Sequence, residues 1–317
     1  MEYLILILSL AGIVLGADFL VKGAVVVARK CRVSSFVIGA VIVGIGTSLP
    51  ELVVSTVGAI GGNSEVAIGN VVGSNIFNVF AILGLTALFF PLAVSRENMK
   101  FEIPFCIAVS ILLMLLVYNF FIVGEPRLGR WDGAALLLVF TSFMWISLRR
   151  GKSSAATVGE SVEEENKSLW FAAFSILGGL AALIVSSNFF VDEAVAIARK
   201  LGVSDAFISI TLLACGTSLP ELAASVTAAV KKDTDMALGN IIGSNIFNVT
   251  MILGTASLIT PLTTGKIGLV NYGAMILAAV LPMIFGIRGK ITRFEGMLML
   301  LCYAAYTWYI VTYVMAV

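Results

Sequence analysis

The sequence contains no histidine and few charged side chains. Charged residues make up 12% of its 317 positions and hydrophobic residues 59%, whereas a soluble domain carries about 25% charged residues. The absence of histidine removes the commonest general base and the commonest transition-metal ligand. The net charge of +1 gives no reason to expect a nucleic-acid partner. The composition therefore predicts a polytopic membrane protein surrounded by the lipid bilayer.

Cysteine is also scarce, and no two cysteines are close enough in sequence to form a known motif. The four residues are Cys31, Cys106, Cys215 and Cys302, so neither a disulfide framework nor a CxxC site is predicted. The first residues read MEYLILIL and lack a basic region and a cleavage site, which favours a first span over a signal peptide. We expect no cofactor and no obligatory protein partner.

Long apolar stretches dominate the rest of the chain. About ten of them approach the ~20 residues that a membrane-spanning helix needs. The expected spans are 3–27, 35–61, 66–90, 101–121, 131–148, 169–197, 206–230, 236–260, 269–287 and 294–315. The one long polar connection predicts a first unit at 1–148, a cytoplasmic linker at 149–167 and a second unit at 168–317.

Basic residues indicate how the spans are oriented. Lysine and arginine are concentrated in the loops that follow the odd-numbered spans. Cytoplasmic loops carry this excess, so the odd loops are predicted in the cytoplasm and both termini outside.

The chain repeats two signatures at one offset. GIGTSLPE at Gly44–Glu51 returns as ACGTSLPE at Ala214–Glu221, and GNVVGSNIFN at Gly69–Asn78 returns as GNIIGSNIFN at Gly239–Asn248, each 170 positions later. A fixed internal offset indicates two copies of one unit. Five spans per unit place the second copy upside down relative to the first. The predicted fold is an all-α membrane protein of ten transmembrane helices arranged as two inverted five-helix repeats.

The signatures place polar groups where hydrocarbon is expected. Pro50 cannot donate to the carbonyl of Gly46, and Pro220 likewise frees a carbonyl in the second copy; freed backbone is tolerated at membrane depth only beside a cavity or ligand. Thr47 and Glu51 share a helix face. Carboxylate, hydroxyl, amide and carbonyl oxygens form a ligand set suited to a hard cation such as Ca²⁺.

Two copies meeting at the midplane would bring Glu51 and Glu221 together. An empty, doubly negative pocket is costly to seal within a low-dielectric bundle, and a bound cation lowers that cost. A protein that changes its side of access only when occupied is an antiporter.

A purely structural role is the alternative to ion binding for the same residues. Each GTSLPE segment could be a proline-kinked packing helix, and Asn75 and Asn245 could either bind the ion or join helices by hydrogen bonds. Asn70 and Asn240 are expected to hold backbone or line the ion path.

The doubled signatures resemble those of the cation/calcium antiporter superfamily, and are most similar to prokaryotic sodium/calcium exchangers. The resemblance implies ten helices, four of them around the site, two sliding gate helices, a prokaryotic inner membrane location and transport without enzymatic activity. Its implied cation ligands are Thr47, Ser48, Glu51, Ser74, Asn78 and the Gly44 carbonyl, with Thr217, Ser218, Glu221, Ser244, Asn248 and the Ala214 carbonyl.

Two positions depart from the family pattern. Gly44 replaces a common alanine and preserves the carbonyl, whereas Asn248 stands where several members have aspartate. The pocket then holds two carboxylates, and Na⁺ is the expected coupling ion, with H⁺ or K⁺ coupling as the alternative. A cation channel and an intramembrane hydrolase are further alternatives; the latter lacks histidine and paired aspartate motifs.

Overall fold

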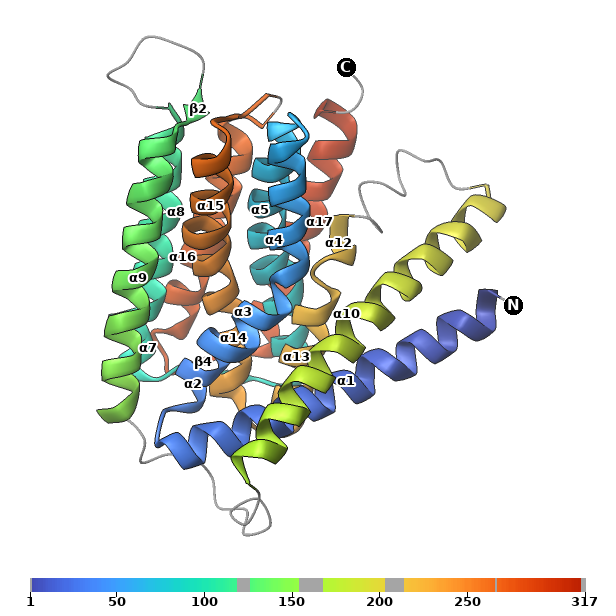
Figure 1. The fold of residues 1–317 in the computed structure, drawn as a ribbon, viewed down its shortest axis with the longest axis vertical. Helices are drawn as coiled ribbons and strands as arrows, with labels where there is room; N and C mark the ends of the chain where they lie inside the picture. Colours follow the sequence, from blue (N-terminus) through green and yellow to red (C-terminus); the bar gives the residue numbers. More distant parts are fainter. Residues whose placement is uncertain (1, 119–125, 154–167, 203–213, 266, 315–317) are drawn as a thin grey trace.

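The protein is a bundle of long apolar helices (Figure 1). The computed structural model describes residues 2–118, 126–153, 168–202, 214–265 and 267–314. Regular helices satisfy their own backbone hydrogen bonds, which is why apolar sequences of this kind adopt them in lipid. The predicted span at 206–230 and the predicted linker at 149–167 lie partly outside the described residues.

The first part of the chain, as far as it is described, forms α-helices and two π-helical segments, marked η. Their bounds are α1 (Glu2–Cys31), α2 (Ser35–Ile38), η1 (Gly39–Val43), α3 (Gly44–Thr47), α4 (Leu49–Ile60), α5 (Ser64–Phe77), η2 (Asn78–Leu83), α6 (Gly84–Phe89), α7 (Arg96–Lys100), α8 (Glu102–Tyr118) and α9 (Arg130–Ser153).

The second part follows the same order within the described residues. Its helices are α10 (Leu169–Lys200), α12 (Ala214–Gly216), α13 (Leu219–Val230), α14 (Thr234–Phe247), η6 (Asn248–Ile252), α15 (Leu253–Ile259), α16 (Leu269–Gly286), α17 (Arg293–Tyr309) and η7 (Ile310–Val314).

Several of these helices join end to end into spans. Within the described residues, eight helices or continuous runs are long and apolar enough to cross a membrane, and the bent pair Ser35–Thr47 and Leu49–Ile60 makes a ninth. The chain is therefore an all-helical, multi-span membrane protein.

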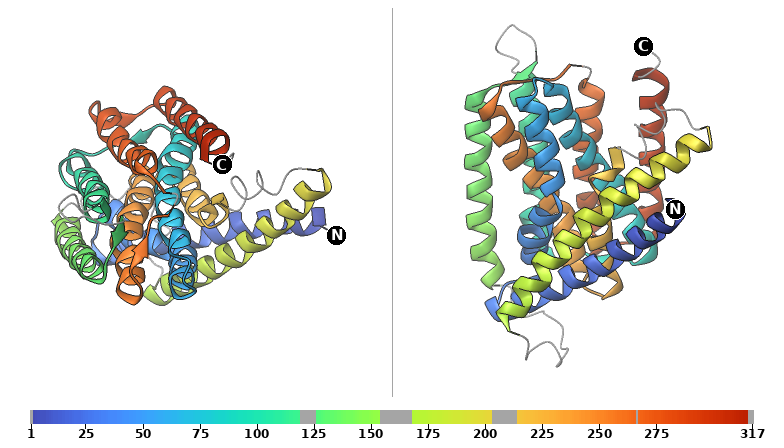
Figure 2. Two further views of the ribbon diagram at one scale, coloured as in Figure 1. Left: turned by 90° about the horizontal axis from the view of Figure 1, so that it is seen from above. Right: turned by 45° about the vertical axis from the view of Figure 1, so that its right-hand side comes forward.

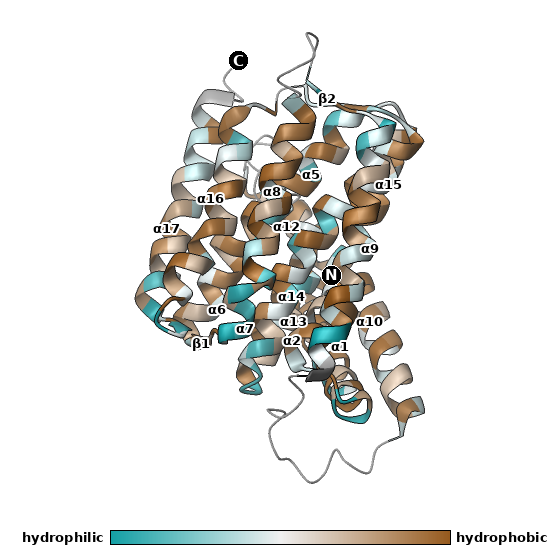
Figure 3. Ribbon diagram, turned by 90° about the vertical axis from the view of Figure 1, so that its left-hand side faces the viewer, coloured by the Kyte–Doolittle hydropathy of each residue, from teal (hydrophilic) through white to brown (hydrophobic). Residues whose placement is uncertain are grey.

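Burial separates central from peripheral spans. The apolar window of Ser64–Phe89 is 78% buried and that of Thr234–Ile259 is 83% buried, whereas that of Leu169–Lys200 is 22% buried. Figure 3 shows mainly hydrophobic residues along the helices and hydrophilic ones near β1 and α7. Both spans that carry the GSNIFN signature thus lie at the centre, and the outer helices present apolar side chains to lipid.

Helices α1 and α10 cross the bundle obliquely, side by side (Figures 1 and 2). α1 has 30 residues and is about 45 Å long, which exceeds the ~30 Å hydrocarbon core and requires a tilt. An added Cβ at Gly16 would lie 2.9 Å from Gly179 O. Glycine at this crossing therefore permits the two backbones to pack closely.

Short strand pairs join the two parts of the chain. β1 (Leu92–Ala93) pairs antiparallel with β4 (Lys290–Ile291), and β2 (Arg127–Leu128) pairs antiparallel with β3 (Leu262–Thr263). β2 lies at the top and β4 at the bottom of Figure 1. Each pair therefore ties a connection of the first part to one of the second, at opposite ends of the bundle.

Candidate ion-binding site

Each GTSLPE signature breaks its helix at the serine. Ser48 has φ −84° and ψ 10°, and the helices on either side of it are bent by 47°. Ser218 has nearly the same conformation, φ −93° and ψ 7°. Proline at the start of α4 and α13 explains the break, because it cannot continue the preceding helix but suits the first turn of a new one.

The break creates a new helix N-terminus beside each glutamate. Glu51 lies in the first turn of α4 and Glu221 in the first turn of α13. Unsatisfied amide groups there carry partial positive charge, which favours an adjacent carboxylate.

Each glutamate accepts a hydrogen bond from the serine that caps the other glutamate's helix. Ser48 Oγ donates to Glu221 Oε1 over 2.8 Å, and Ser218 Oγ donates to Glu51 Oε1 over 3.0 Å. All four side chains are fully buried. The prediction that Glu51 and Glu221 converge inside the bundle is confirmed.

One oxygen of each carboxylate has no hydrogen-bond partner. Glu51 Oε2 and Glu221 Oε2 are both buried and unpaired. A buried, unpaired carboxylate oxygen is costly, and a bound cation would remove that cost.

The central helices α5 and α14 present two amides to the same region. Asn78 and Asn248 begin the π-helical segments η2 and η6, and π-helical turns often mark functional sites. η2 packs against α13, and η6 packs against α4. Oδ1 of each amide is buried without a partner. Each amide oxygen is thus an available cation ligand.

Asn70 and Asn240 hold the backbone of the glutamates, as expected from the sequence. Asn70 Nδ2 donates to Glu51 O over 3.3 Å, and Asn240 Nδ2 donates to Glu221 O over 3.1 Å. Each amide also donates to a buried serine hydroxyl, Ser55 or Ser225. The serine partners, both in the helices that begin with LPE, were not anticipated from the sequence.

The hydroxyl groups on the two sides of the site are bonded differently. Thr47 Oγ1 lies 3.3 Å from Gly44 O, and Ser244 Oγ donates to the same carbonyl over 3.2 Å. The residues 170 positions away, Thr217 and Ser74, have hydroxyls without a partner. The Gly44 side is therefore closed by internal hydrogen bonds, whereas the opposite side has free donors and acceptors.

Two predicted ligands are less closely tied to the others. Thr217 lies beside the Glu51 carboxylate, but its hydroxyl makes no hydrogen bond of good geometry there. Ala214 begins α12, three residues before Thr217.

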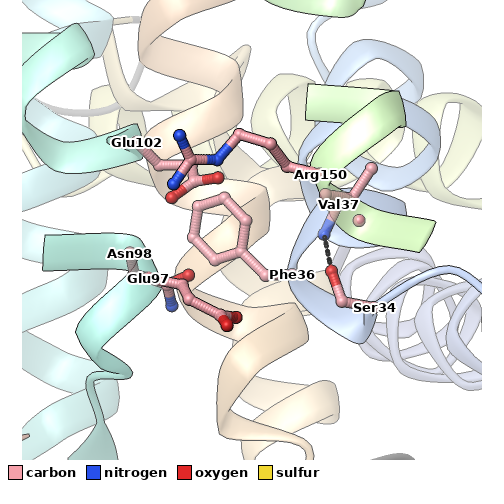
Figure 4. A pocket seen from close by; sticks show the side chains of 8 residues that line it. Ser34, Phe36, Val37, Glu97, Asn98, Glu102 and Arg150 are labelled. Atoms are coloured by element: carbon pink, nitrogen blue, oxygen red, sulfur yellow. Dashed lines mark hydrogen bonds between the residues drawn. The ribbon is translucent and has the colours of Figure 1, made fainter. Parts of the chain in front are cut away.

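A second polar pocket lies away from both signatures. It has a volume of about 270 Å³ and is lined by residues from three separate stretches of the chain: Ser34, Phe36, Val37, Glu97, Asn98, Glu102, Arg150 and Gly151. Figure 4 shows Glu102 and Arg150 pointing toward the space above the Phe36 ring. The sequence did not single out this pocket, because no motif or spacing connects its residues.

Comparisons with known proteins agree with this geometry. A family model described as sodium/calcium exchanger protein matches residues 1–149 and 171–312. The sodium/calcium exchanger MaX1 of Methanosarcina acetivorans is 35% identical over 339 residues, covering 96% of this chain and 97% of MaX1. The inner membrane protein YrbG of Escherichia coli is 33% identical over 290 residues, covering 87% of this chain and 86% of YrbG.

A solved structure of the sodium-calcium exchanger NCX_Mj, soaked with 10 mM Na⁺ and zero Ca²⁺, shares the fold. Its TM-score is 0.83 at 32% sequence identity, with 98% of each chain covered. The match therefore includes both parts of the chain, with helices α4 and α13 that hold the two glutamates. This protein belongs to the sodium/calcium exchanger family and is a secondary transporter, not an enzyme.

Proposed function

We propose that this protein exchanges Ca²⁺ for Na⁺ across the membrane by alternating access. The observation that carries the proposal is the pair of fully buried glutamates, each with one carboxylate oxygen bonded across the site and the other unpaired. Oxygen ligands of this kind suit Ca²⁺ and Na⁺. The inorganic cations are substrates that bind transiently.

The proposed ligands are those that the family resemblance implies. Glu51 and Glu221 supply the negative charge, and the amide oxygens of Asn78 and Asn248 are unpaired beside them. The remaining oxygens come from Thr47, Ser48, Ser74, Thr217, Ser218 and Ser244 and from the carbonyls of Gly44 and Ala214.

We further propose that the chain forms ten membrane spans arranged as two inverted repeats. The crossed serine–glutamate bonds exchange with each other when every residue is replaced by the one 170 positions away. The two strand pairs lie at opposite ends of the bundle and correspond less closely, because β1 and β3 are 170 positions apart whereas their partners β4 and β2 are 163 positions apart. Both observations support a two-fold axis in the membrane plane.

The unequal hydrogen bonding of the two sides supports alternating access. Thr47 and Ser244 are bonded on one side, while Thr217 and Ser74 are free on the other. Two nearly identical units in different bonding states are what a transporter open to one side requires. Exchanging those states would open the opposite side.

The basic loops and the relatives support the proposed location. Lysine and arginine are concentrated in loops after odd spans, a distribution that favours a cytoplasmic position for those loops and an outside position for both termini. The similar protein YrbG is an inner membrane protein. We therefore place this chain in the inner membrane of a prokaryotic cell.

The coupling ion is tested by ion replacement in proteoliposomes. We expect ⁴⁵Ca²⁺ uptake to be driven by an outward Na⁺ gradient and by neither K⁺, Li⁺ nor a pH gradient alone. Uptake driven by pH alone would support H⁺ coupling, the alternative raised by the amide at Asn248. Single-channel currents in planar bilayers would instead support a channel.

A further inference from the structure

We propose that Asn75 and Asn245 are positioning residues that fix the orientation of the amides of Asn248 and Asn78. This inference rests on the proposed function, in which those amides bind the transported ion. We call the four residues the amide clamp. All four are at least 98% buried, and they come from the two GSNIFN signatures.

The clamp begins with two reciprocal bonds between the central helices. Asn75 Nδ2 donates to Asn245 O over 3.1 Å, and Asn245 Nδ2 donates to Asn75 O over 3.2 Å. Each side chain thus uses its NH₂ group on the backbone of the opposite helix. Because the oxygen and nitrogen of an amide are not interchangeable as donor and acceptor, these bonds fix which way each amide faces.

The fixed amides then orient the candidate ligands. Asn75 Oδ1 accepts from Asn248 Nδ2 over 3.0 Å, and Asn245 Oδ1 accepts from Asn78 Nδ2 over 3.0 Å. The NH₂ group of each ligand amide is consumed in this way. Its oxygen remains buried and unpaired, in the orientation that a cation requires.

A reversed ligand amide would be unfavourable on both sides. If the Asn248 amide were flipped, its oxygen would face Asn75 Oδ1, an acceptor against an acceptor, and its NH₂ group would face the cation. Groups that orient a ligand typically change metal affinity 10–100-fold when they are removed.

The bond pattern predicts which substitutions are coupled. Asn75 bonds to Asn248 but not to the side chain of Asn78, although Asn78 is closer in sequence. Substitutions of bonded residues have non-additive effects, and those of independent residues add. Asn75 and Asn248 should therefore be coupled, whereas Asn75 and Asn78 should be nearly additive.

The experiment is a double-mutant cycle on equilibrium ⁴⁵Ca²⁺ binding to the purified full-length protein. Asn75→Ala and Asn248→Ala should each weaken binding by roughly 10-fold or more, and the double variant should be little weaker than the more affected single variant. The matched cycle uses Asn75→Ala with Asn78→Ala, for which the fold-changes should multiply. Equal behaviour of the two cycles would overturn the positioning role.

The same data separate this inference from the proposed function. If Asn78→Ala and Asn248→Ala both leave Ca²⁺ affinity unchanged, the ligand assignment itself is wrong. If both weaken binding but neither is coupled to its bonded partner, only the clamp is wrong. Ser257→Ala is the folding control, because it removes a buried hydroxyl bond to Leu253 O within α15.

If Asn75→Ala does not fold, the mirror-image cycle serves instead. Asn245 Oδ1 accepts from Asn78 Nδ2 and has no such bond to the side chain of Asn248, so Asn245→Ala should be coupled to Asn78→Ala and additive with Asn248→Ala. A general loss of packing would not produce this pattern of coupling, and the opposite pattern would contradict the inference.

Discussion

At the scale of single residues, the site depends on two carboxylates that are only half satisfied. Glu51 and Glu221 each accept one hydrogen bond from the opposite serine and leave the other oxygen unpaired. A neutral amide in either place removes a negative charge and directs an NH₂ group at a cation.

We therefore expect Glu51→Gln and Glu221→Gln each to abolish Ca²⁺ uptake in proteoliposomes. Both proteins should remain folded, because the substituted side chain retains an acceptor for its serine and no longer buries a charge. Size-exclusion chromatography and thermal unfolding check the fold. Normal uptake by either variant would remove that residue from the site.

The two backbone-holding asparagines provide a matched pair at the same scale. Asn240 also accepts from Thr47 Oγ1 at 3.3 Å, and it is more buried than Asn70. Asn240→Ala should thus break one more contact than Asn70→Ala, at a more fully buried position. We expect a loss of about 1–3 kcal/mol of stability for Asn240→Ala and a smaller loss for Asn70→Ala, measured by denaturant unfolding in detergent; the reverse order would contradict the bonding described.

The gathering of these side chains around the two glutamates could largely be predicted from the sequence, because a repeated polar signature in an apolar chain has few structural explanations; their role as ion ligands stays a prediction. The orientation of its amides could not. Asn75 and Asn78 are both asparagines on neighbouring turns, and only the packing of α5 against the second half decides which amide oxygen is bonded and which is free.

At the scale of helices, an ion pair ties the long helix α1 to the residue that follows α13. Asp18 lies 2.7 Å from Lys231 and 2.6 Å from Lys22, one turn away on α1. The four-residue spacing of Asp18 and Lys22 places both on one face of α1, whereas Lys231 reaches Asp18 only because α1 packs against α13. The positions 170 residues away from Asp18 and Lys231, which are Asn188 and Gly61, carry no charge, so this tie has no counterpart in the other half.

Removing Lys231 should therefore affect movement more than ion binding. We expect Lys231→Ala to change the rate of Ca²⁺ exchange while leaving the equilibrium Kd for Ca²⁺ unchanged and costing less than about 1 kcal/mol of stability, since the pair is partly exposed. Lys22→Ala is the control, because it removes an ion pair within α1 only. A changed Kd, or equal effects of the two variants, would show that the tie between helices has no special role.

Helix positions were predicted more accurately than helix conformation. Apolar length places the described spans within a few residues, for example α16 at Leu269–Gly286 against the expected 269–287. The π-helical starts at Asn78 and Asn248 were not predicted, because the two central spans are buried on most of their faces and show too little hydrophobic periodicity to reveal an extra residue in one turn. α9 also continues to Ser153, past the predicted start of the linker at 149.

At the scale of the whole molecule, the two halves are nearly identical in their signatures and unlike in their contacts. α1 packs along α13, whereas the corresponding helices α10 and α4 share at most marginal contact. The two equivalent threonine hydroxyls also differ: that of Thr47 is hydrogen-bonded, whereas that of Thr217 has no partner. A sequence that repeats GTSLPE unchanged cannot indicate which half is closed; only the structure distinguishes them.

The two glutamates impose one requirement on the change of access from one side of the membrane to the other. The buried glutamates need a cation before the bundle can close over them, because sealing two unpaired charges in a low-dielectric interior is costly. The empty protein should therefore be unable to exchange the bonding states of its two halves.

The most direct test is the efflux of ⁴⁵Ca²⁺ from loaded proteoliposomes into three external media: one containing Na⁺, one containing Ca²⁺, and one in which a large organic cation replaces both. We predict rapid efflux into the first two media and almost none into the third. Sustained efflux into the third medium, at a rate comparable to the others, would show that the empty site reorients freely and would contradict this account.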